Sequence, residues 1–285
     1  MDQADGARQI RNSARGLRFT GDKAALPLMR RKPNYGKLRP MARKPPADAP
    51  PPPFAGFGAG ALPFFADLAA NQTRDWFLEH RADYERDVKG PLGSLVHALA
   101  FAFAAHDIPL TGDARRSLFR LNRDVRFSNN KAPYKTNAGA VMTRDGTKNT
   151  LGMLYVQIGG DEGSFMAVGF YGAEPKDLAA LRHGVADRAE QWLEVVAELA
   201  EAGLAPSMGH ALTRLPKGFE DHAGSPIADA LKMRNFVVSR PIAPPDLERV
   251  ELIDDIVAFT AAALPLLRFG WSALDRARGA AEAIR

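Results

Sequence analysis

One short stretch of the chain concentrates the side chains best suited to chemistry. Residues 120–135 read Arg-Leu-Asn-Arg-Asp-Val-Arg-Phe-Ser-Asn-Asn-Lys-Ala-Pro-Tyr-Lys, and we call them the cationic segment. Five Lys or Arg residues accompany a single Asp here, which gives a net charge of +4. Clustered guanidinium and ammonium groups repel one another, and they become favourable when an anion lies between them. The cationic segment therefore predicts a site for a phosphate-bearing or carboxylate-bearing ligand.

Two kinds of role follow from the residue types in and near this segment. Asp124 is a candidate base, and Tyr134, which lies between two ammonium groups in the sequence, is a candidate acid or base. Hydrolysis or transfer on a phosphorylated substrate is the reaction that we expect. The candidate ligand-binding residues are the cations of the segment and two upstream aromatic residues that are candidate pocket walls: Arg120, Arg123, Arg126, Lys131, Lys135, Trp76 and Tyr84.

Two other functions fit the same residues. In the first, the protein is a non-catalytic structural or interaction protein, and Asp124 with acidic residues from elsewhere neutralises the arginines in an ion-pair network. In the second, the chain binds nucleic acid through backbone phosphates, so that its affinity falls steeply with salt. Residues 56–285 hold 26 Lys or Arg against 29 Asp or Glu, which counts against nucleic acid as the partner. We rank the anion site first and the nucleic-acid module last.

Composition excludes several kinds of site. The chain has 285 residues and no cysteine, so disulfides, thiolate zinc sites, iron–sulfur clusters and a cysteine nucleophile are excluded. Its six histidines never occur as His-x-x-x-His, and we therefore expect no metal site built on a local motif. No phosphate-binding loop motif is present, and the cofactor stays unknown. We expect a cytoplasmic protein without a membrane span, because no apolar run approaches about 18 residues.

Residues 1–55 differ from the rest of the chain. They hold 12 Lys or Arg, 4 Asp or Glu and 9 of the 21 prolines, without an apolar period. Such a composition predicts a disordered tail, followed by a single α+β domain over residues 56–285. Three interpretations of the tail stay open: a solvated extension with Met41 as the true start, a basic arm for nucleic acid or acidic membrane, and a targeting peptide.

Hydrophobic periodicity predicts the elements that must position the cationic segment. Apolar residues recur every three or four positions before residue 117 and again after residue 175, and they alternate in between. Strands joined by short turns pair antiparallel, so the fold class is α+β: an antiparallel sheet of about four to six strands flanked by N-terminal and C-terminal helices. The expected strands are 117–127, 136–143, 153–158, 165–171, 212–215 and 236–239, and the expected helices are 62–68, 73–88, 91–103, 175–202, 227–233 and 246–264.

Within this scheme the cationic segment begins in a strand. Side chains alternate along a strand, so Arg120, Asp124 and Arg126 would share one face. Arg123 falls on the opposite face with the apolar residues, where a buried guanidinium needs a partner. Residues 128–130 have turn chemistry, which would let the two lysines that follow point back at the arginine face.

Three blocks of sequence resemble a conserved hypothetical, domain-of-unknown-function family of bacteria and fungi. The longest runs Arg120-x-x-Arg123-Asp124-x-Arg126-Phe127-Ser128-x-x-Lys131-x-Pro133-Tyr134-Lys135-Thr136. The others are Asn71-Gln72-Thr73-Arg74-Asp75-Trp76-Phe77, followed by Tyr84, and Leu215-Pro216-Lys217-Gly218-Phe219. The resemblance covers roughly residues 57–274, and Gln72 stands where the family more often has Asn. It implies kinship, and it implies no activity, substrate or cofactor.

Overall fold

The structure is a computed structural model that describes residues 51–124, 126 and 131–283. Most of the predicted tail, together with Val125, Phe127 and the predicted turn at 128–130, lies outside these residues. Phe54, which the sequence places in the tail, is buried in the core beside Phe57, with 5.6 Å between the ring centroids. The packed part of the chain therefore includes Phe54.

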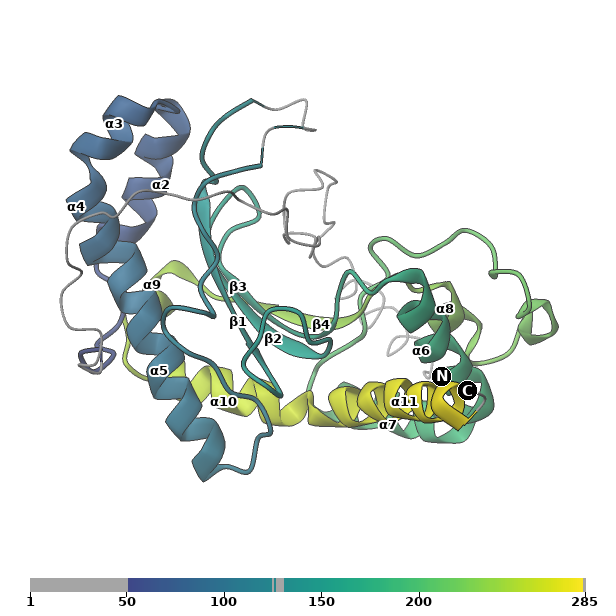
Figure 1. Ribbon diagram of the computed structural model, residues 1–285. Helices are drawn as coiled ribbons and strands as arrows, with labels where there is room; N and C mark the ends of the chain where they lie inside the picture. The colour runs from purple at the N-terminus through teal and green to yellow at the C-terminus, as the bar shows by residue number, and fades with distance from the viewer. Residues whose placement is uncertain (1–50, 125, 127–130, 284–285) are drawn as a thin grey trace, which may run out of the picture.

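A four-stranded antiparallel sheet lies at the centre of the molecule (Figure 1). The spatial order β1-β2-β3-β4 follows the order in the sequence, and every neighbouring pair is antiparallel. The α+β class is thereby confirmed, with four strands at the lower end of the expected range. The strands are β1 Asn137–Thr143, β2 Met153–Gly159, β3 Phe165–Phe170 and β4 Phe236–Pro241.

Helices flank the sheet on both sides. Figure 1 shows the N-terminal helices at one end of the sheet, α6 to α8 at the other, and α10 and α11 running alongside. The N-terminal group is α2 Ala61–Ala70, α3 Arg74–Glu79, α4 Arg81–Asp83, the π-helix η1 Tyr84–Lys89 and α5 Gly90–Ala105. The remainder are α6 Pro175–Asp187, α7 Ala189–Glu201, the 3₁₀ helix η2 Glu220–His222, α8 Ala228–Lys232, α9 Pro244–Leu247, α10 Leu252–Ala262 and α11 Leu264–Ala283.

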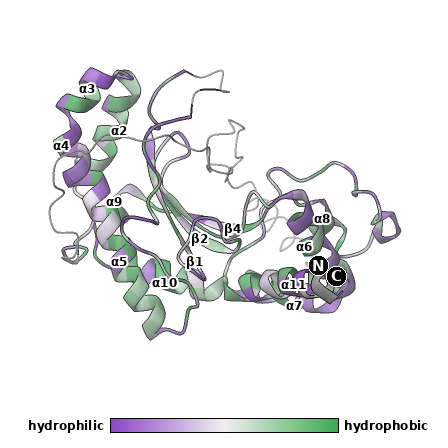
Figure 2. Ribbon diagram, in the orientation of Figure 1, coloured by the Kyte–Doolittle hydropathy of each residue, from purple (hydrophilic) through white to green (hydrophobic). Residues whose placement is uncertain are grey.

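The two faces of the sheet belong to two hydrophobic clusters. Leu154, Val156 and Ile158 of β2 point into the main core, where α5 packs on the sheet. Alternation along the strand turns Tyr155 to the opposite face. There a smaller cluster forms, with Phe119 and Tyr171 packed against its buried members Tyr155, Phe165, Ala167 and Val237. Figure 2 shows the predominantly hydrophobic colouring of α5 and α10, which supply much of the main core.

The N-terminal helices differ from expectation at two places, and the first is His80, where the helix predicted over 73–88 is interrupted between α3 and α4. The Thr73 hydroxyl accepts a hydrogen bond from the backbone N–H of Trp76, as expected for an N-cap. The second place is the gap predicted between the helices 73–88 and 91–103, which is wrong because the wide π turn of η1 continues directly into α5. A Cβ at Gly90 would lie 2.8 Å from the carbonyl oxygen of Glu85, so the wide turn depends on glycine there.

One helical stretch, Arg81–Ala105, is long and apolar enough to cross a membrane by length and composition alone. Its residues Leu92, Leu95, Leu99 and Phe103 are buried in the main core. The core helix of a globular domain passes the same test, so this stretch is weak evidence for a membrane span.

Two of the long predicted helices are divided. The helix expected over 175–202 is interrupted at Arg188, whose φ of −134° is not helical. The Arg188 guanidinium lies 4.4 Å from the Phe269 ring centroid and donates to the Ser272 hydroxyl of α11, so tertiary contacts set the break. The helix expected over 246–264 is divided between α9, α10 and the start of α11. The strand predicted at 212–215 is irregular chain instead.

A candidate anion site at the edge of the sheet

The first half of the cationic segment is extended chain held by isolated bridges, and not the strand predicted over 117–127. Leu118 bridges Ala140 of β1, and Asn122 bridges Tyr134. Between these bridges the backbone N–H of Phe119 donates to the Gly139 carbonyl at 2.9 Å. The described part of the segment thus folds back on itself beside β1 and brings its two halves together.

Two lysines lie over the Phe119 ring, and two arginines act electrostatically on one of them. The ammonium nitrogens of Lys135 and Lys148 lie 5.7 Å and 4.9 Å from the centroid of the Phe119 ring. Burial lowers the pKa of Lys135 to about 8, and the positive charges of Arg120, Arg123 and Lys148 act in the same direction. We call Arg120, Arg123, Lys135 and Lys148 the cation cluster.

The described residues place little acidic charge beside this cluster, apart from the Asp124 carboxylate, which acts on Arg120 at longer range. Among the described residues, no carboxylate lies within salt-bridge distance of any of its four members. Lys148 instead donates a hydrogen bond to the backbone carbonyl of Leu118, and burial lowers its pKa. The Arg123 Nε atom is buried and finds no hydrogen-bond acceptor in the described part of the chain. Desolvated like charges without a counterion are unfavourable, and an anion would relieve that cost.

The Asp124 carboxylate pairs with Arg126, which is outside the cation cluster. Its two carboxylate oxygens accept hydrogen bonds from Nε and Nη2 of Arg126, at 2.9 Å and 2.7 Å. These bonds, together with the backbone N–H of Arg126, hold the pKa of the Asp124 carboxyl well below its usual range. Because its pKa is lowered, Asp124 is ionised at neutral pH. Both side chains of the pair are exposed. This pair is the part of the predicted ion-pair network that the structure contains.

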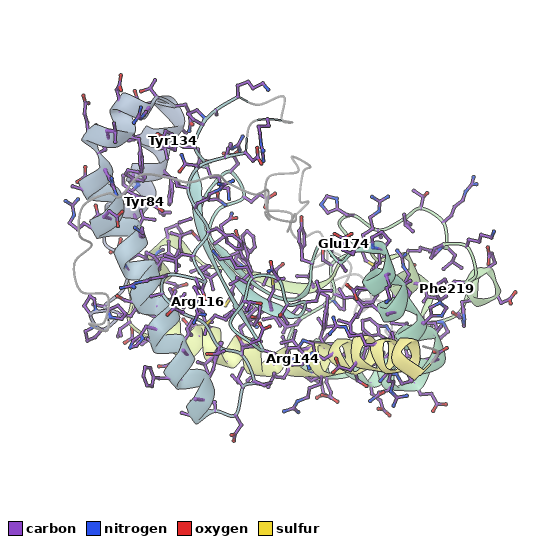
Figure 3. All side chains as sticks on the ribbon, viewed as in Figure 1. Tyr84, Arg116, Tyr134, Arg144, Glu174 and Phe219 are labelled. Atoms are coloured by element: carbon purple, nitrogen blue, oxygen red, sulfur yellow. The ribbon has the colours of Figure 1, made fainter. Side chains whose placement is uncertain are left out.

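The predicted aromatic residues lie on the other side of the segment, among the N-terminal helices (Figure 3). Tyr84 is buried against Phe64 and Phe77, and burial raises its pKa to about 12. Tyr134 is buried with its ring 4.7 Å from that of Phe77, and its backbone N–H donates to the Gln72 side chain. The Trp76 ring stacks on His80 at 4.0 Å.

The predicted site residues therefore separate into three groups. Arg120, Arg123 and Lys135 come together in the cation cluster, whereas Arg126 pairs with Asp124 and Lys131 is exposed. The rings of Trp76, Tyr84 and Tyr134 pack instead against Phe64 and Phe77 of the N-terminal helices. The roles predicted for these three aromatic residues and for Asp124 thus stay predictions, and the cation cluster does not include them.

Sequence reasoning missed two members of the site. Lys148 lies in the loop between β1 and β2, well beyond Lys135 in the sequence, and only the hairpin register brings it back to Phe119. The predicted alternation of side chains assigns Phe119 to the apolar face of the strand. In the structure, Lys135 and Lys148 both lie over the Phe119 ring. The described residues contain no group of three or more His, Asp or Glu side chains that could hold a metal ion.

The fold and the cluster define a mixed α+β protein with a candidate anion site at one edge of its sheet. Residues 60–269 match the model of a family described as "Conserved hypothetical protein (DUF2461)", and the chain belongs to this family. No curated protein and no solved structure matches the chain. The family description gives no activity.

Proposed function

We propose that this protein binds an anionic ligand, bearing a phosphate or a carboxylate, at the cation cluster. One observation supports the proposal above all: Lys135 is partly buried among three other cations, and its pKa is lowered to about 8 without an acidic neighbour to oppose the shift. Proteins keep buried charges paired or use them to bind ligands. The exposed Arg120 adds a planar guanidinium that can donate two parallel hydrogen bonds to one anion.

Calorimetric titration with inorganic phosphate, pyrophosphate and citrate tests this proposal. We expect binding by the unmodified protein and a loss of at least about tenfold in affinity for Lys135→Met and for Arg120→Gln. Arg116→Gln is the matched control, because Arg116 is exposed, pairs with Asp113 and lies close to Arg120 in the sequence. Its affinity should match that of the unmodified protein.

The same titrations distinguish the structural alternative. If the motif serves only the fold, none of the three anions binds, and neutralising the cluster lowers the melting temperature. An anion site predicts the reverse, because removing one of several repelling cations stabilises the unliganded protein. The combination of no binding with a lowered melting temperature for Lys135→Met would therefore refute the proposal.

Hydrolysis or transfer on a phosphorylated substrate is the reaction that this site suits best. Lys135 could give a proton to the leaving oxygen as the phosphorus–oxygen bond breaks, while water adds to phosphorus and returns a proton to the amine. A pKa of about 8 is close to that needed at neutral pH. Lys135→Arg keeps the charge and removes this proton transfer. Turnover of an alkyl phosphomonoester such as glycerol 2-phosphate, whose alkoxide leaving group needs this proton, should then fall, while phosphate binding persists.

A further inference from the structure

Lys135 and Lys148 lie over the same Phe119 ring, but their amines have different partners. Lys148 donates a hydrogen bond to the backbone carbonyl of Leu118, and a hydrogen bond of this kind favours the charged form of an amine. In the part of the chain that the structure describes, the Lys135 nitrogen has neither a hydrogen-bond acceptor nor a carboxylate within bonding distance. No hydrogen bond therefore stabilises the charged form of Lys135.

Solvent reaches the Lys135 nitrogen. Among the described residues, the buried side-chain nitrogen and oxygen atoms that lack a hydrogen-bond partner are Arg123 Nε, Arg182 Nε and Ser225 Oγ. The Lys135 nitrogen also lacks a partner and is not one of these atoms, so it is accessible even though its side chain is half-buried. A small molecule in solution can thus contact this amine directly.

The cation cluster favours the neutral form of the Lys135 amine. Partial burial removes water from the ammonium group, and the positive charges of Arg120, Arg123 and Lys148 repel it. At pH 7, a pKa of about 8 in place of 10.5 raises the unprotonated fraction of the amine about 300-fold. An unprotonated lysine beside other cations is a nucleophile toward carbonyl carbon.

We infer that the Lys135 amine forms an imine with the carbonyl group of small aldehydes and ketones that bear a phosphate or a carboxylate. This inference rests on the proposed function, because Arg120 and Lys148 would bind the anionic group while the amine attacks the carbonyl carbon. The nitrogen lone pair forms a bond to that carbon, and the carbonyl oxygen leaves as water with both amine hydrogens. A carbon–nitrogen double bond thereby replaces the carbon–oxygen double bond, and the step needs no other reactant.

Reductive trapping of the full chain at pH 7 tests this inference. The probes are glycolaldehyde phosphate and glycolaldehyde, which has the same carbonyl group without the anion. Sodium cyanoborohydride reduces the imine to a stable amine, and mass spectrometry locates the labelled lysine. We expect glycolaldehyde phosphate to label Lys135 at least about tenfold faster than Lys176, an exposed lysine of α6 outside the cluster. Glycolaldehyde should show a smaller preference, and inorganic phosphate should compete only with the phosphate-bearing probe.

The ratio of the two labelling rates at Lys135 reports the contribution of the anion site. Arg120→Gln keeps the Lys135 amine and removes one cation that would bind the phosphate, so this ratio should fall. Changes in the reactivity of the amine itself affect both probes alike and cancel in the ratio. Arg116→Gln is the matched control, because Arg116 is exposed and pairs with Asp113, and its ratio should equal that of the unmodified protein.

The inference and the proposed function fail in different ways. If inorganic phosphate binds in the calorimetric titration but Lys135 is labelled no faster than Lys176, or equally fast by both probes, the inference is overturned and the anion site stands. If phosphate does not bind, the proposed function fails. Rapid labelling of Lys135 by both probes would then show a reactive amine without an anion site, and the inference, which requires an anionic substrate, would fail as well.

Discussion

At the scale of the residue, Lys135 lowers the stability of the folded protein, and we propose that it binds the anion. Its pKa in the folded protein is about 8, against 10.5 for an ordinary lysine, because of burial and three neighbouring cations. Between these two pH values the unfolded chain binds more protons than the folded chain, so stability rises with pH there. Below about pH 8 the lysine is charged in both states, and its full cost persists.

Replacing Lys135 with methionine should therefore stabilise the unliganded protein at pH 7. Methionine fills a similar volume without a charge, so the desolvation and the repulsion both disappear. For a domain of this size the melting temperature should rise by about 2–4 °C for each kcal/mol removed. Thermal unfolding at pH 7 and pH 10 measures this, and the difference from the unmodified protein should shrink as pH increases. A variant that is less stable at pH 7 would contradict the argument.

The Asp124→Asn variant tests whether the single acid of the cationic segment is needed for stability, for phosphate binding or for turnover. Its pair with Arg126 is exposed, and exposed ion pairs contribute little to stability. The negative charge of Asp124 also acts on Arg120, so its removal leaves the cluster more positive. We expect an unchanged melting temperature and somewhat tighter phosphate binding at low salt, with the difference lost at high salt. Loss of phosphomonoester turnover at full binding would instead support the catalytic role predicted from sequence.

The sequence predicts which residues are cationic, but not which of them meet. Local alternation treats Arg120 and Arg126 as equivalent on one face of a strand, yet Arg126 pairs with Asp124, whereas Arg120 and Lys148 both act on Lys135. The charge density of the cationic segment is visible in the sequence. The pairing of charges depends on backbone bridges and a hairpin loop, which local periodicity does not encode.

At the scale of the element, the packing of Tyr155 on the face of β1 and β2 depends on Gly139. The Tyr155 ring leans across the strand over Gly139, where an added Cβ would lie 2.6 Å from the tyrosine oxygen and 2.8 Å from a ring carbon. Tyr155 is buried and donates a hydrogen bond to the Gln157 side chain at 3.2 Å. The position of the Tyr155 ring between Phe119 and Phe165 therefore depends on this contact.

Gly139→Ala should destabilise the protein and displace the Tyr155 ring. Overpacking a closely packed contact typically costs about 1–3 kcal/mol. The control is Gly279→Ala in α11, where nothing lies near the added Cβ and where alanine should stabilise the helix by about 0.5–1 kcal/mol. Denaturant unfolding measures both changes. Equal stability of the two variants would show that the Tyr155 ring moves away freely.

Strands that pair with a neighbouring strand along most of their length are predicted well from the sequence. Segments that make only isolated bridges, or that depend on distant side chains, are not predicted well. The four strands each pair along most of their length, and every residue of β2 and β3 is buried. The segment from 117 has the same alternation but only isolated bridges, because it lies beside β1 as a loop that folds back. The break at Arg188 is set by the ring of Phe269, which is distant in the sequence, and no local period reports such a contact.

At the scale of the whole molecule, the C-terminal helix holds the loop that supplies Lys148. The indole N–H of Trp271 in α11 donates to the Leu151 carbonyl at 3.0 Å, and the Arg144 guanidinium lies 4.7 Å from the Trp271 ring centroid. Arg144 also pairs with Asp275 of the same helix. Figure 3 places Arg144 beside α11, on the side of the sheet away from Tyr134. Both ends of the β1–β2 loop are thus attached to the helical layer.

The Trp271→Phe variant tests whether this attachment positions the cation cluster. Losing the hydrogen bond to a carbonyl should destabilise the protein by about 1–3 kcal/mol. Because the loop then moves more freely, Lys148 should spend less time over Phe119, and phosphate should bind more weakly, though less so than in Lys148→Met. Trp192→Phe is the control, since Trp192 is buried and its ring packs against Phe236 and Phe269, away from the loop. Equal phosphate affinity in the two tryptophan variants, after both are shown to be folded at the temperature of the titration, would mean that the cluster is positioned by the sheet edge alone.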